Sequence, residues 1–167
     1  MASELAVGVV VKVSGPLVIA RGLKGSRMYD MVRAGKLGLL GEIIEIRGDR
    51  YSMQVYEETE GMAPGEPVTP TGQALSVELG PGLISSVYDG VQRPLDVLRA
   101  KYGDFIVRGA ESPALDRTKR WGFKPLAKVG DRVAQGDVLG TVKETELVLH
   151  KIMVAPRVSG RIESIRA

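Results

Sequence analysis

Short apolar runs separated by glycine and proline turns make up the first 75 residues. In the run at 7–13, valine occupies alternate positions: Val9, Val11 and Val13. The pair Gly15-Pro16 ends this run, and a second apolar run at 17–20 ends before Gly22. Alternation with a period of two residues is typical of β-strands, and Gly and Pro set the backbone angles of tight turns. The pattern therefore predicts short strands joined by tight turns.

The clearest hairpin lies at residues 42–56. Its two strands, 42–47 and 50–56, are separated by the two-residue turn Gly48-Asp49. Alternation predicts one apolar face on each strand, made by Ile44 and Ile46 in the first and by Tyr51, Met53 and Val55 in the second. Several short strands in so few residues favour a small closed barrel, because closure leaves no strand edge exposed. We expect this β-barrel to occupy residues 1–75.

A linker at 76–108 is predicted to follow the barrel, with one short helix at 94–102. Pro94 stands at the start of this helix and Gly103 follows its end, which is the usual polarity of a helix. Leu95, Leu98 and Tyr102 fall on one side, so the helix should pack by one stripe.

A second β region is predicted over 109–167. In it the pair Gly-Asp recurs six residues apart, at 130–131 and 136–137, and apolar strands follow at 147–154 and 158–165. The predicted fold class is therefore all-β, with the barrel first, one short helix between, and a barrel-sandwich, lipoyl-like domain last. No closing strand or helix precedes Ala167, so we expect this last domain to be incomplete.

Composition narrows the function classes. The chain is 44% apolar and 26% charged with a net charge of +3, the balance of a globular protein. No apolar stretch approaches the ~20 residues of a membrane span, and the first residues do not resemble a signal peptide. The absence of cysteine excludes disulfides and thiolate metal sites, and fits a reducing cytoplasm.

Motifs for catalysis and metal binding are not found. None of the nine lysines is followed by Ser or Thr, so the phosphate-binding P-loop pattern is absent. His150 is the only histidine, which excludes paired-histidine ligation, and we expect it to pack within a strand. The acidic residues Glu57, Glu58 and Glu60 could bind a cation, although a solvated turn is favoured. We expect no catalytic, cofactor-binding or metal site in these 167 residues.

Two other function classes remain open. The basic residues at 117–120 beside Trp121 could bind nucleic acid or a protein partner. A solvated loop is favoured, because Asp and Glu (20) nearly balance Lys and Arg (23). The stretch 130–140 also resembles biotinyl and lipoyl carrier domains. However, Lys151 lies between His150 and Ile152 in an apolar strand, whereas carriers display the modified lysine at a hairpin tip.

Most of the chain resembles the catalytic A subunit of archaeal and vacuolar-type rotary ATPases. The stretches GVVVKVSGPLVIA, MYDMVRAGKLGLLGEIIEIRGD, SVELGPGL and YDGVQRPL resemble the N-terminal barrel of that family and the linker after it. The stretches RGAESPALDRTKRWGFKP, VGDRVAQGDVLGTV and HKIMVAPRVSGRI resemble the start of its inserted bulge domain. The P-loop and the C-terminal helical region of that family have no counterpart here, so we expect a non-catalytic part of a longer subunit.

The resemblance implies roles for both regions. The barrel would join a ring in which A and B subunits alternate, and the bulge would contact the peripheral stalk. The resemblance also implies a tether from the barrel to the catalytic domain, made by Asp89, Gly90, Gln92, Arg93 and Pro94. Candidate residues for the stalk contact are Arg117, Lys119, Arg120, Trp121 and Phe123. ATP and magnesium would belong to the parent subunit. The chain would bind no nucleic acid, would be cytoplasmic, and would meet the membrane only through the assembled complex.

Overall fold

The computed structural model describes residues 5–166 as an all-β protein with one short helix. The chain divides into two compact units. The first comprises residues up to Val77 together with Val97–Ser112, and the second comprises Glu78–Asp96 together with the residues from Pro113 onward. The predicted fold class is thereby confirmed. The predicted boundaries at 75 and 108 stay a prediction, since each compact unit is assembled from two separate stretches.

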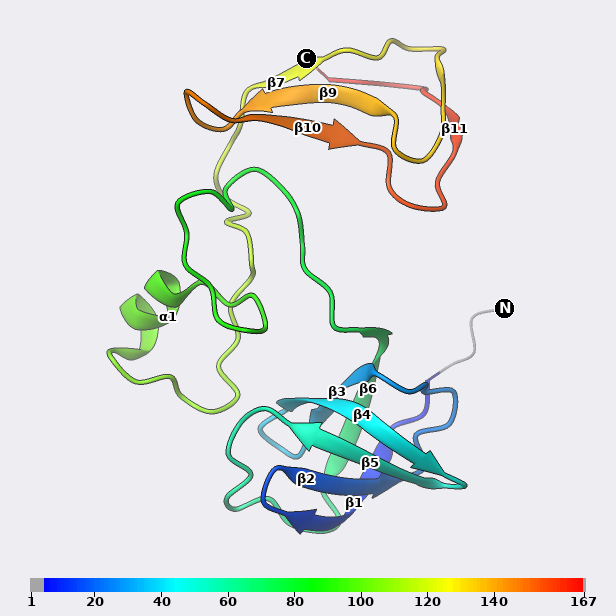
Figure 1. The fold of residues 1–167 in the computed structure, drawn as a ribbon, viewed down its shortest axis with the longest axis vertical. Coiled ribbons are helices and arrows are strands. Elements are labelled where there is room, and N and C mark those ends of the chain that lie inside the picture. Colours follow the sequence, from blue (N-terminus) through cyan, green and yellow to red (C-terminus); the bar gives the residue numbers. More distant parts are fainter. Residues whose placement is uncertain (1–4, 167) are drawn as a thin grey trace. The chain divides into compact units, whose positions relative to one another are not determined.

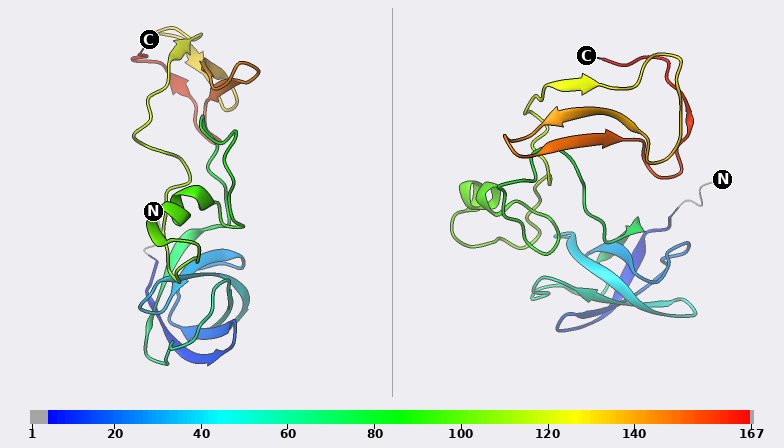
Figure 2. Two further views of the ribbon diagram at one scale, coloured as in Figure 1. Left: turned by 90° about the vertical axis from the view of Figure 1, so that its left-hand side faces the viewer. Right: turned by 45° about the horizontal axis from the view of Figure 1, so that its top comes forward.

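The first unit contains a closed six-stranded antiparallel barrel (Figure 1; Figure 2, left). Its strands are β1 (Gly8–Ser14), β2 (Leu17–Arg21), β3 (Asp30–Ala34), β4 (Leu39–Arg47), β5 (Arg50–Val55) and β6 (Pro67–Ala74). The order around the barrel is β1-β2-β5-β4-β3-β6, and β6 pairs with β1 to close it. Closure gives every strand two neighbours, which is how a sheet of such short strands avoids a free edge.

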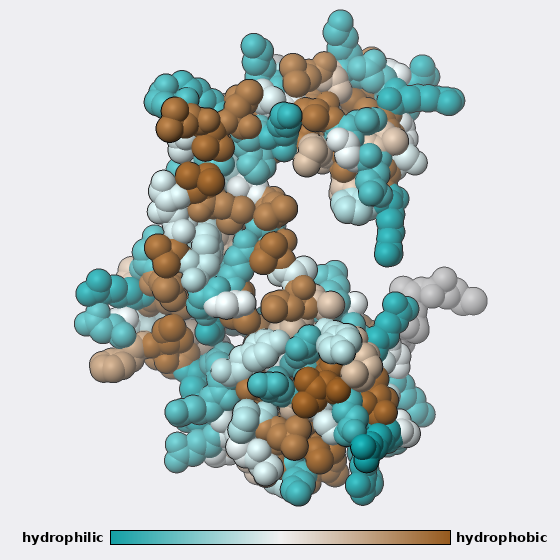
Figure 3. Space-filling view, in the orientation of Figure 1, coloured by the Kyte–Doolittle hydropathy of each residue, from teal (hydrophilic) through white to brown (hydrophobic). Residues whose placement is uncertain are grey.

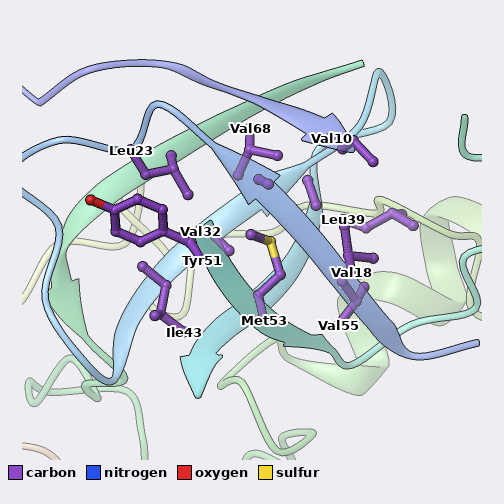
Figure 4. Close-up of a cluster of buried hydrophobic side chains, with 12 residues drawn as sticks. Val10, Val18, Leu23, Val32, Leu39, Ile43, Tyr51, Met53, Val55 and Val68 are labelled. Atoms are coloured by element: carbon purple, nitrogen blue, oxygen red, sulfur yellow. The ribbon is translucent and has the colours of Figure 1, made fainter. Parts of the chain in front are cut away.

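The barrel interior is one cluster of buried apolar side chains (Figure 4). Its members are Val10, Val18, Ala20, Leu23, Val32, Ala34, Leu39, Ile43, Tyr51, Met53, Val55 and Val68. All six strands contribute, so the core assembles only when the whole barrel closes. Burial of apolar side chains at this density is the main source of stability for a domain of this size.

Two β-bulges change which apolar residues face the core. The register shifts between Val10 and Lys12 in β1, and between Ile43 and Glu45 in β4. The core therefore receives Val10 and Ile43, whereas Val11 and Ile44 are 41% and 39% exposed. The predicted face of Ile44 with Ile46 is wrong, because the extra residue in a bulge breaks the two-residue period.

The bulge in β1 likewise interrupts the alternation of the valine run at 7–13. Val13 packs against the core, but Val9 and Val11 point outward. The predicted face of Tyr51, Met53 and Val55 is confirmed, because β5 pairs with β2 without a shift and all three side chains are buried.

The predicted hairpin at 42–56 is confirmed as β4 and β5, with Arg47 opposite Arg50. The turn residue Gly48 has a φ of 59°, the left-handed value that a type II′ turn needs at its first central position. The Asp49 carboxylate also accepts a hydrogen bond from the Gly22 N–H at 3.2 Å. The hairpin turn thus contacts the end of β2.

The predicted short helix is present as α1 (Leu95–Tyr102). Its last turn is closed by a hydrogen bond from the Gly103 N–H to the Arg99 carbonyl at 2.9 Å. Leu98 is buried, Leu95 and Tyr102 are half-buried, and the intervening residues are exposed. The single apolar stripe expected from the sequence is therefore confirmed.

The second unit is built from five short strands in two small sheets. Strands β7 (Phe123–Pro125), β9 (Val138–Lys143) and β10 (Leu149–Met153) form one sheet in the order β10-β9-β7. Strands β8 (Arg132–Val133) and β11 (Gly160–Arg161) form the other. This arrangement fits the barrel-sandwich shape predicted for the region.

The repeated Gly-Asp pair makes the same turn twice. Asp131 accepts a hydrogen bond from the Lys128 N–H at 2.8 Å, and Asp137 accepts one from the Ala134 N–H at 2.7 Å. Both turn glycines have a φ near 90°, a backbone conformation that side chains disfavour. Each turn then pairs through two backbone hydrogen bonds with a later residue, the first with Ile162 and the second with Val154. The two Gly-Asp turns thus connect the first part of the two-sheet region to its later part, at Val154 and Ile162.

Candidate functional site

The predicted tether forms a closed hydrogen-bonded loop. The Asp89 carboxylate accepts hydrogen bonds from the backbone N–H groups of Val91, at 3.1 Å, and Arg93, at 2.8 Å. The Arg93 guanidinium donates to the other carboxylate oxygen at 2.6 Å, and both side chains are largely buried, at 16% and 15% exposed. Asp89 and Arg93 therefore hold the two sides of the loop together through both backbone and side-chain contacts.

Gln92 fixes the position of this loop on the second unit. Its side-chain carbonyl accepts a hydrogen bond from the Glu78 N–H at 2.6 Å, and its amide donates to the Glu78 carbonyl at 2.8 Å. The backbone of Gln92 is left-handed, with a φ of 61°, which is uncommon for a residue other than glycine. An antiparallel bridge between Tyr88 and Pro94 closes the base of the loop. The structure brings the predicted tether residues together in one hydrogen-bonded loop.

The loop also affects the ionisation of Asp89. Burial raises the pKa of a carboxyl group, but the hydrogen bonds from Arg93 and Val91 and the charge of Arg93 outweigh that effect. The pKa of Asp89 is therefore held below its ordinary value. The charged form is the one that the loop stabilises.

The five residues of the candidate stalk-contact surface lie in different surroundings. Arg117 forms an ion pair with Glu78. The Lys119 ammonium lies 4.2 Å from the centre of the Trp121 ring, within the range of a cation–π contact. Arg120 is exposed. Phe123 lies in β7 with its ring against Gly140, where any side chain would collide with it. Arg117, Lys119 and Arg120 are therefore the exposed residues of the predicted surface, and Trp121 and Phe123 are half-buried.

Asp116 gives this surface its local structure. Its carboxylate accepts hydrogen bonds from the Thr118 hydroxyl at 2.6 Å, the Thr118 N–H at 2.8 Å and the Lys119 N–H at 3.3 Å. These hydrogen bonds, led by that of the Thr118 hydroxyl, lower the pKa of Asp116. The loop before Trp121 is thus a defined turn.

Sequence reasoning missed a buried carboxylate in the second unit. The Glu144 side chain is only 2% exposed and lies 3.6 Å from His150 Nδ1. It accepts hydrogen bonds from the N–H groups of Gly82, at 2.6 Å, and Ile84, at 3.1 Å. Burial raises its pKa, but these two hydrogen bonds and the charges of His150 and Lys119 together outweigh burial, so the net shift of the pKa is downward. Glu144 thus anchors the glycine-proline loop at 80–82 to the β9 end.

The sequence around Glu144 does not predict that its side chain is buried, since acidic residues commonly end strands. The GPGL loop gives a partial indication, because its backbone N–H groups need a hydrogen-bond acceptor when they are buried. That need does not identify which of the chain's carboxylates, Glu144 included, is the acceptor.

The carrier alternative receives no support from the position of its lysine. Lys151 lies in the middle of β10, paired with Thr141. The tip of the β9–β10 hairpin, 144–148, contains no lysine. A carrier displays its modified lysine at such a tip, so this arrangement differs from the one that carrier chemistry needs.

The acidic residues at 57–60 contact residues 108 and 109, Glu57 through its carboxylate and the other two through their backbone carbonyls. Glu57 accepts a hydrogen bond from the Gly109 N–H at 2.7 Å. Arg108 donates to the carbonyls of Glu58, at 3.5 Å, and Glu60, at 2.6 Å. Within residues 5–166, no group of three or more His, Cys, Asp or Glu side chains is arranged to hold a metal ion. In the same range, no helix has the length and apolarity to cross a bilayer.

Comparison with known proteins identifies both regions. Residues 10–72 match the family described as "ATP synthase alpha/beta family, beta-barrel domain", and residues 112–167 match "ATPsynthase alpha/beta subunit barrel-sandwich domain". The chain belongs to the ATP synthase alpha/beta family. The two matches coincide with the six-stranded barrel and the two-sheet region of the second unit.

Individual relatives agree with this family assignment. The chain is 58% identical over 161 residues to the A subunit of the A-type ATP synthase from Pyrococcus horikoshii. It is 57% identical over 159 residues to the V-type ATP synthase alpha chain of Thermoanaerobacter pseudethanolicus. It is also 59% identical over 158 residues to the A subunit of the A-type ATP synthase from Thermococcus sp. strain KI.

These matches cover 95–96% of this chain but only 17% of the Pyrococcus protein and 27% of each of the other two. The chain thus spans roughly a quarter or less of the length of the curated relatives it matches. The predicted relation to the N-terminal part of the A subunit is confirmed.

Proposed function

We propose that this chain supplies the ring-forming barrel and part of the bulge of the A subunit of a rotary ATP synthase or ATPase. The parent subunit would bind ATP and magnesium, and would work in a cytoplasmic sector attached to the membrane through the rest of the complex. This chain would carry no part of the catalytic chemistry, since it lacks the Lys-Ser/Thr pair of a P-loop.

The observation that carries the ring proposal is the position of two exposed apolar residues. Val11 and Ile44 are the extra residues of the two barrel bulges, and both point outward. Strands β1 and β4 stand three strands apart in either direction around the barrel, so these residues lie on opposite sides of it (Figure 1). Each member of a ring needs contacts for two neighbours on two different faces.

The side that carries Val11 is the more apolar of the two. Val9, Val11 and Leu17 are all at least 38% exposed on β1 and β2. On the opposite side, Ile44 shares the outer face of β4 with Glu42, which accepts a hydrogen bond from the Tyr56 hydroxyl at 3.2 Å. The two sides therefore differ chemically, as they should if the two contacts to alternating B subunits differ.

The test is assembly with the barrel region of the B subunit from the same complex. Alone, the chain should be a monomer or weak dimer by light scattering, because its own copies cannot reproduce an alternating contact. Mixed with the B region, it should form a heterodimer, and Val11→Glu and Ile44→Glu should each weaken one of two contacts. Val129→Glu, which makes the same kind of change at an exposed valine of the second unit, is the matched control. A stable homohexamer of this chain would contradict the proposal.

We further propose that Lys119, Arg120 and Trp121 contact the peripheral stalk. The support is that Lys119 and Arg120 are exposed directly after a turn held by Asp116, and that the Lys119 ammonium lies over the half-buried Trp121 ring. Replacing Trp121 by Ala in the assembled complex should weaken recovery of the stalk proteins while the ring of A and B subunits stays intact. Unchanged recovery of the stalk would overturn this part of the proposal while leaving the ring proposal standing.

We propose that residues 89–94 tether the barrel to the catalytic domain, and the support is the set of hydrogen bonds within this loop. A connector with internal hydrogen bonds transmits movement between domains, whereas a flexible one absorbs it. Asp89→Ala, which removes the acceptor of three hydrogen bonds, should lower the ATPase rate of the assembled parent more than it weakens ring assembly. Equal effects on both measurements would count against a tether role.

A further inference from the structure

One face of the β10-β9-β7 sheet combines lysines with exposed apolar side chains. The register places Lys124 of β7, Thr141 of β9 and Lys151 of β10 in one row across the sheet. Because side chains alternate between the two faces of a strand, Lys143, Leu149 and Met153 lie on this face as well. We call this set the lysine face: Lys124, Thr141, Lys143, Leu149, Lys151 and Met153. Its lysines, Leu149 and Met153 are exposed, whereas His150 and Ile152 on the other face are half-buried.

Two of these lysines lack a carboxylate partner among residues 5–166. Lys143 is 2.8 Å from the Glu146 carboxylate, but Lys124 and Lys151 form no ion pair with any residue from 5 to 166. Adjacent strands in a sheet lie about 4.8 Å apart, so the two lysines flank β9 at about 10 Å from each other. An acidic group above Thr141 would be within reach of both ammonium groups.

Thr141 supplies a hydroxyl in the same row. The residue is only 8% exposed, since the stems of long neighbouring side chains cover the central strand. Among residues 5–166 its hydroxyl makes no hydrogen bond, and the oxygen itself is not among the fully buried ones, so it stays accessible to an incoming group. The hydroxyl can donate to the same acidic group that the two lysines attract.

The lysine face continues into an apolar cavity of about 480 Å³. Met153 lies on the lysine face and also lines the cavity, together with Leu139, Val133, Val158 and Ile162. A volume of this size is within the range of pockets that bind small ligands, so it has room for an aliphatic side chain. The cavity and the lysine row all lie in the second unit, so the surface depends on that unit alone.

We propose that the lysine face binds an acidic polypeptide segment that also carries an aliphatic residue. Carboxylates of the segment would lie over the row Lys124–Thr141–Lys151, and the aliphatic side chain would enter the cavity beside Met153. This surface is separate from the turn at 116–121, and its occupation does not depend on the proposed contact with the stalk.

A polypeptide fits this surface better than a nucleic acid does. The exposed positions of the face include no aromatic ring on which a base could stack and no arginine for a bidentate phosphate contact. The apolar cavity next to the lysines suits an aliphatic side chain, which nucleic acids lack. Charge complementarity and the cavity together indicate a partner that carries both acidic and aliphatic residues.

The test uses the full chain and a fluorescein-labelled peptide of four Glu-Glu-Leu-Glu repeats, followed by anisotropy. The variant Lys124→Gln/Lys151→Gln should weaken binding about tenfold. Lys128→Gln/Lys36→Gln, which makes the same charge change at two exposed lysines outside the face, should change it less than twofold. Thermal unfolding of both variants checks that they remain folded.

A second arm tests the cavity and the class of partner. Met153→Gln should weaken the leucine-bearing peptide at least threefold while leaving an all-glutamate peptide unchanged. Equal losses for both lysine variants would overturn the proposal, since binding would then reflect total charge. Tighter binding of polyphosphate or single-stranded DNA, lost in the same variant, would also overturn it in favour of a phosphate-bearing partner.

Discussion

The barrel and the second unit bury very different amounts of apolar side chain. The barrel gathers twelve buried residues into one cluster. Among the described residues of the second unit, four hydrophobic residues are buried: Leu115, Val142, Val154 and Ile162. Hydrogen-bonded elements hold the second unit together instead. They are the two Gly-Asp turns, the Asp89–Arg93 loop and the contact of Glu144 with the loop at 80–82.

This difference indicates where each unit is sensitive. A close-packed core loses stability when volume is removed, whereas a unit held by buried polar contacts loses it when an acceptor is removed. Exposed apolar side chains occur in both units (Figure 3), so the units differ in what they bury and not in whether they expose apolar residues. The predictions below test this contrast.

The largest effect is expected from Met53→Ala in the barrel. Met53 is fully buried in the cluster, and truncating a buried methionine costs about 2–5 kcal/mol. The free energy of unfolding of the barrel should fall by this amount in a urea titration that is monitored by hydrogen exchange of barrel peptides. Met153→Ala, which removes the same atoms from a side chain that is 56% exposed, should change stability by less than about 0.5 kcal/mol. Similar losses for the two variants would show that the barrel core is not close-packed.

The next effect concerns the second unit. Glu144→Gln keeps the shape of the side chain but removes the charged acceptor of the Gly82 and Ile84 N–H groups. The expected loss is about 1–3 kcal/mol, confined to the second unit. Hydrogen exchange should accelerate at these two amides and stay unchanged in the barrel. Glu146→Gln, at a carboxylate that is 90% exposed, is the control and should leave exchange at both amides as it is.

The same anchor should make the second unit sensitive to acid. The pKa values of Asp89 and Glu144 are both lowered in the folded protein, so the folded state binds these protons less readily than the unfolded chain does. Their contribution is present above the unfolded pKa of about 4 and is lost as pH falls through the lower folded values. Amide protection in the second unit should therefore decline below about pH 4. In Glu144→Gln this decline should be smaller, and an unchanged decline would contradict the assignment.

The smallest effect tests the bulge in β4. Ile43→Val removes a methyl group from the core and should cost about 0.5–1.5 kcal/mol. Ile44→Val removes the same group from an exposed bulge residue and should cost less than about 0.5 kcal/mol. Denaturant midpoints of the two variants give the comparison directly. If Ile44→Val were the more destabilising change, Ile44 and not Ile43 would face the core, and the position of the bulge would be contradicted.

Local features were predictable from the sequence because the residues that cause them are neighbours in the chain. The Gly48-Asp49 turn and the helix between Pro94 and Gly103 both belong to this class, and both are confirmed. The inward face of β5 was also predictable, since that strand has no bulge against β2 and its two-residue period continues without interruption.

The same alternation did not show which side chains of β1 and β4 face the core. A bulge arises from the hydrogen bonds that a partner strand offers, so the pattern Val9, Val11 and Val13 does not reveal that Val10 enters the core. The candidate stalk-contact surface was likewise predictable only in part. The residues at 117–121 were evident as a basic cluster, but the sequence did not indicate that Arg117 pairs with Glu78 or that Phe123 packs on Gly140.

The sequence alone determined the elements and the family, through turn residues, alternation and motifs that extend along most of the chain. The tertiary structure alone decided the strand order of the barrel, the two bulges that turn Val11 and Ile44 outward, and the joining of Glu144 to Gly82 across 62 residues. The reason is physical: a turn depends on backbone angles within a few residues, whereas a strand register or a buried acceptor depends on which distant segments compete for the same hydrogen bonds.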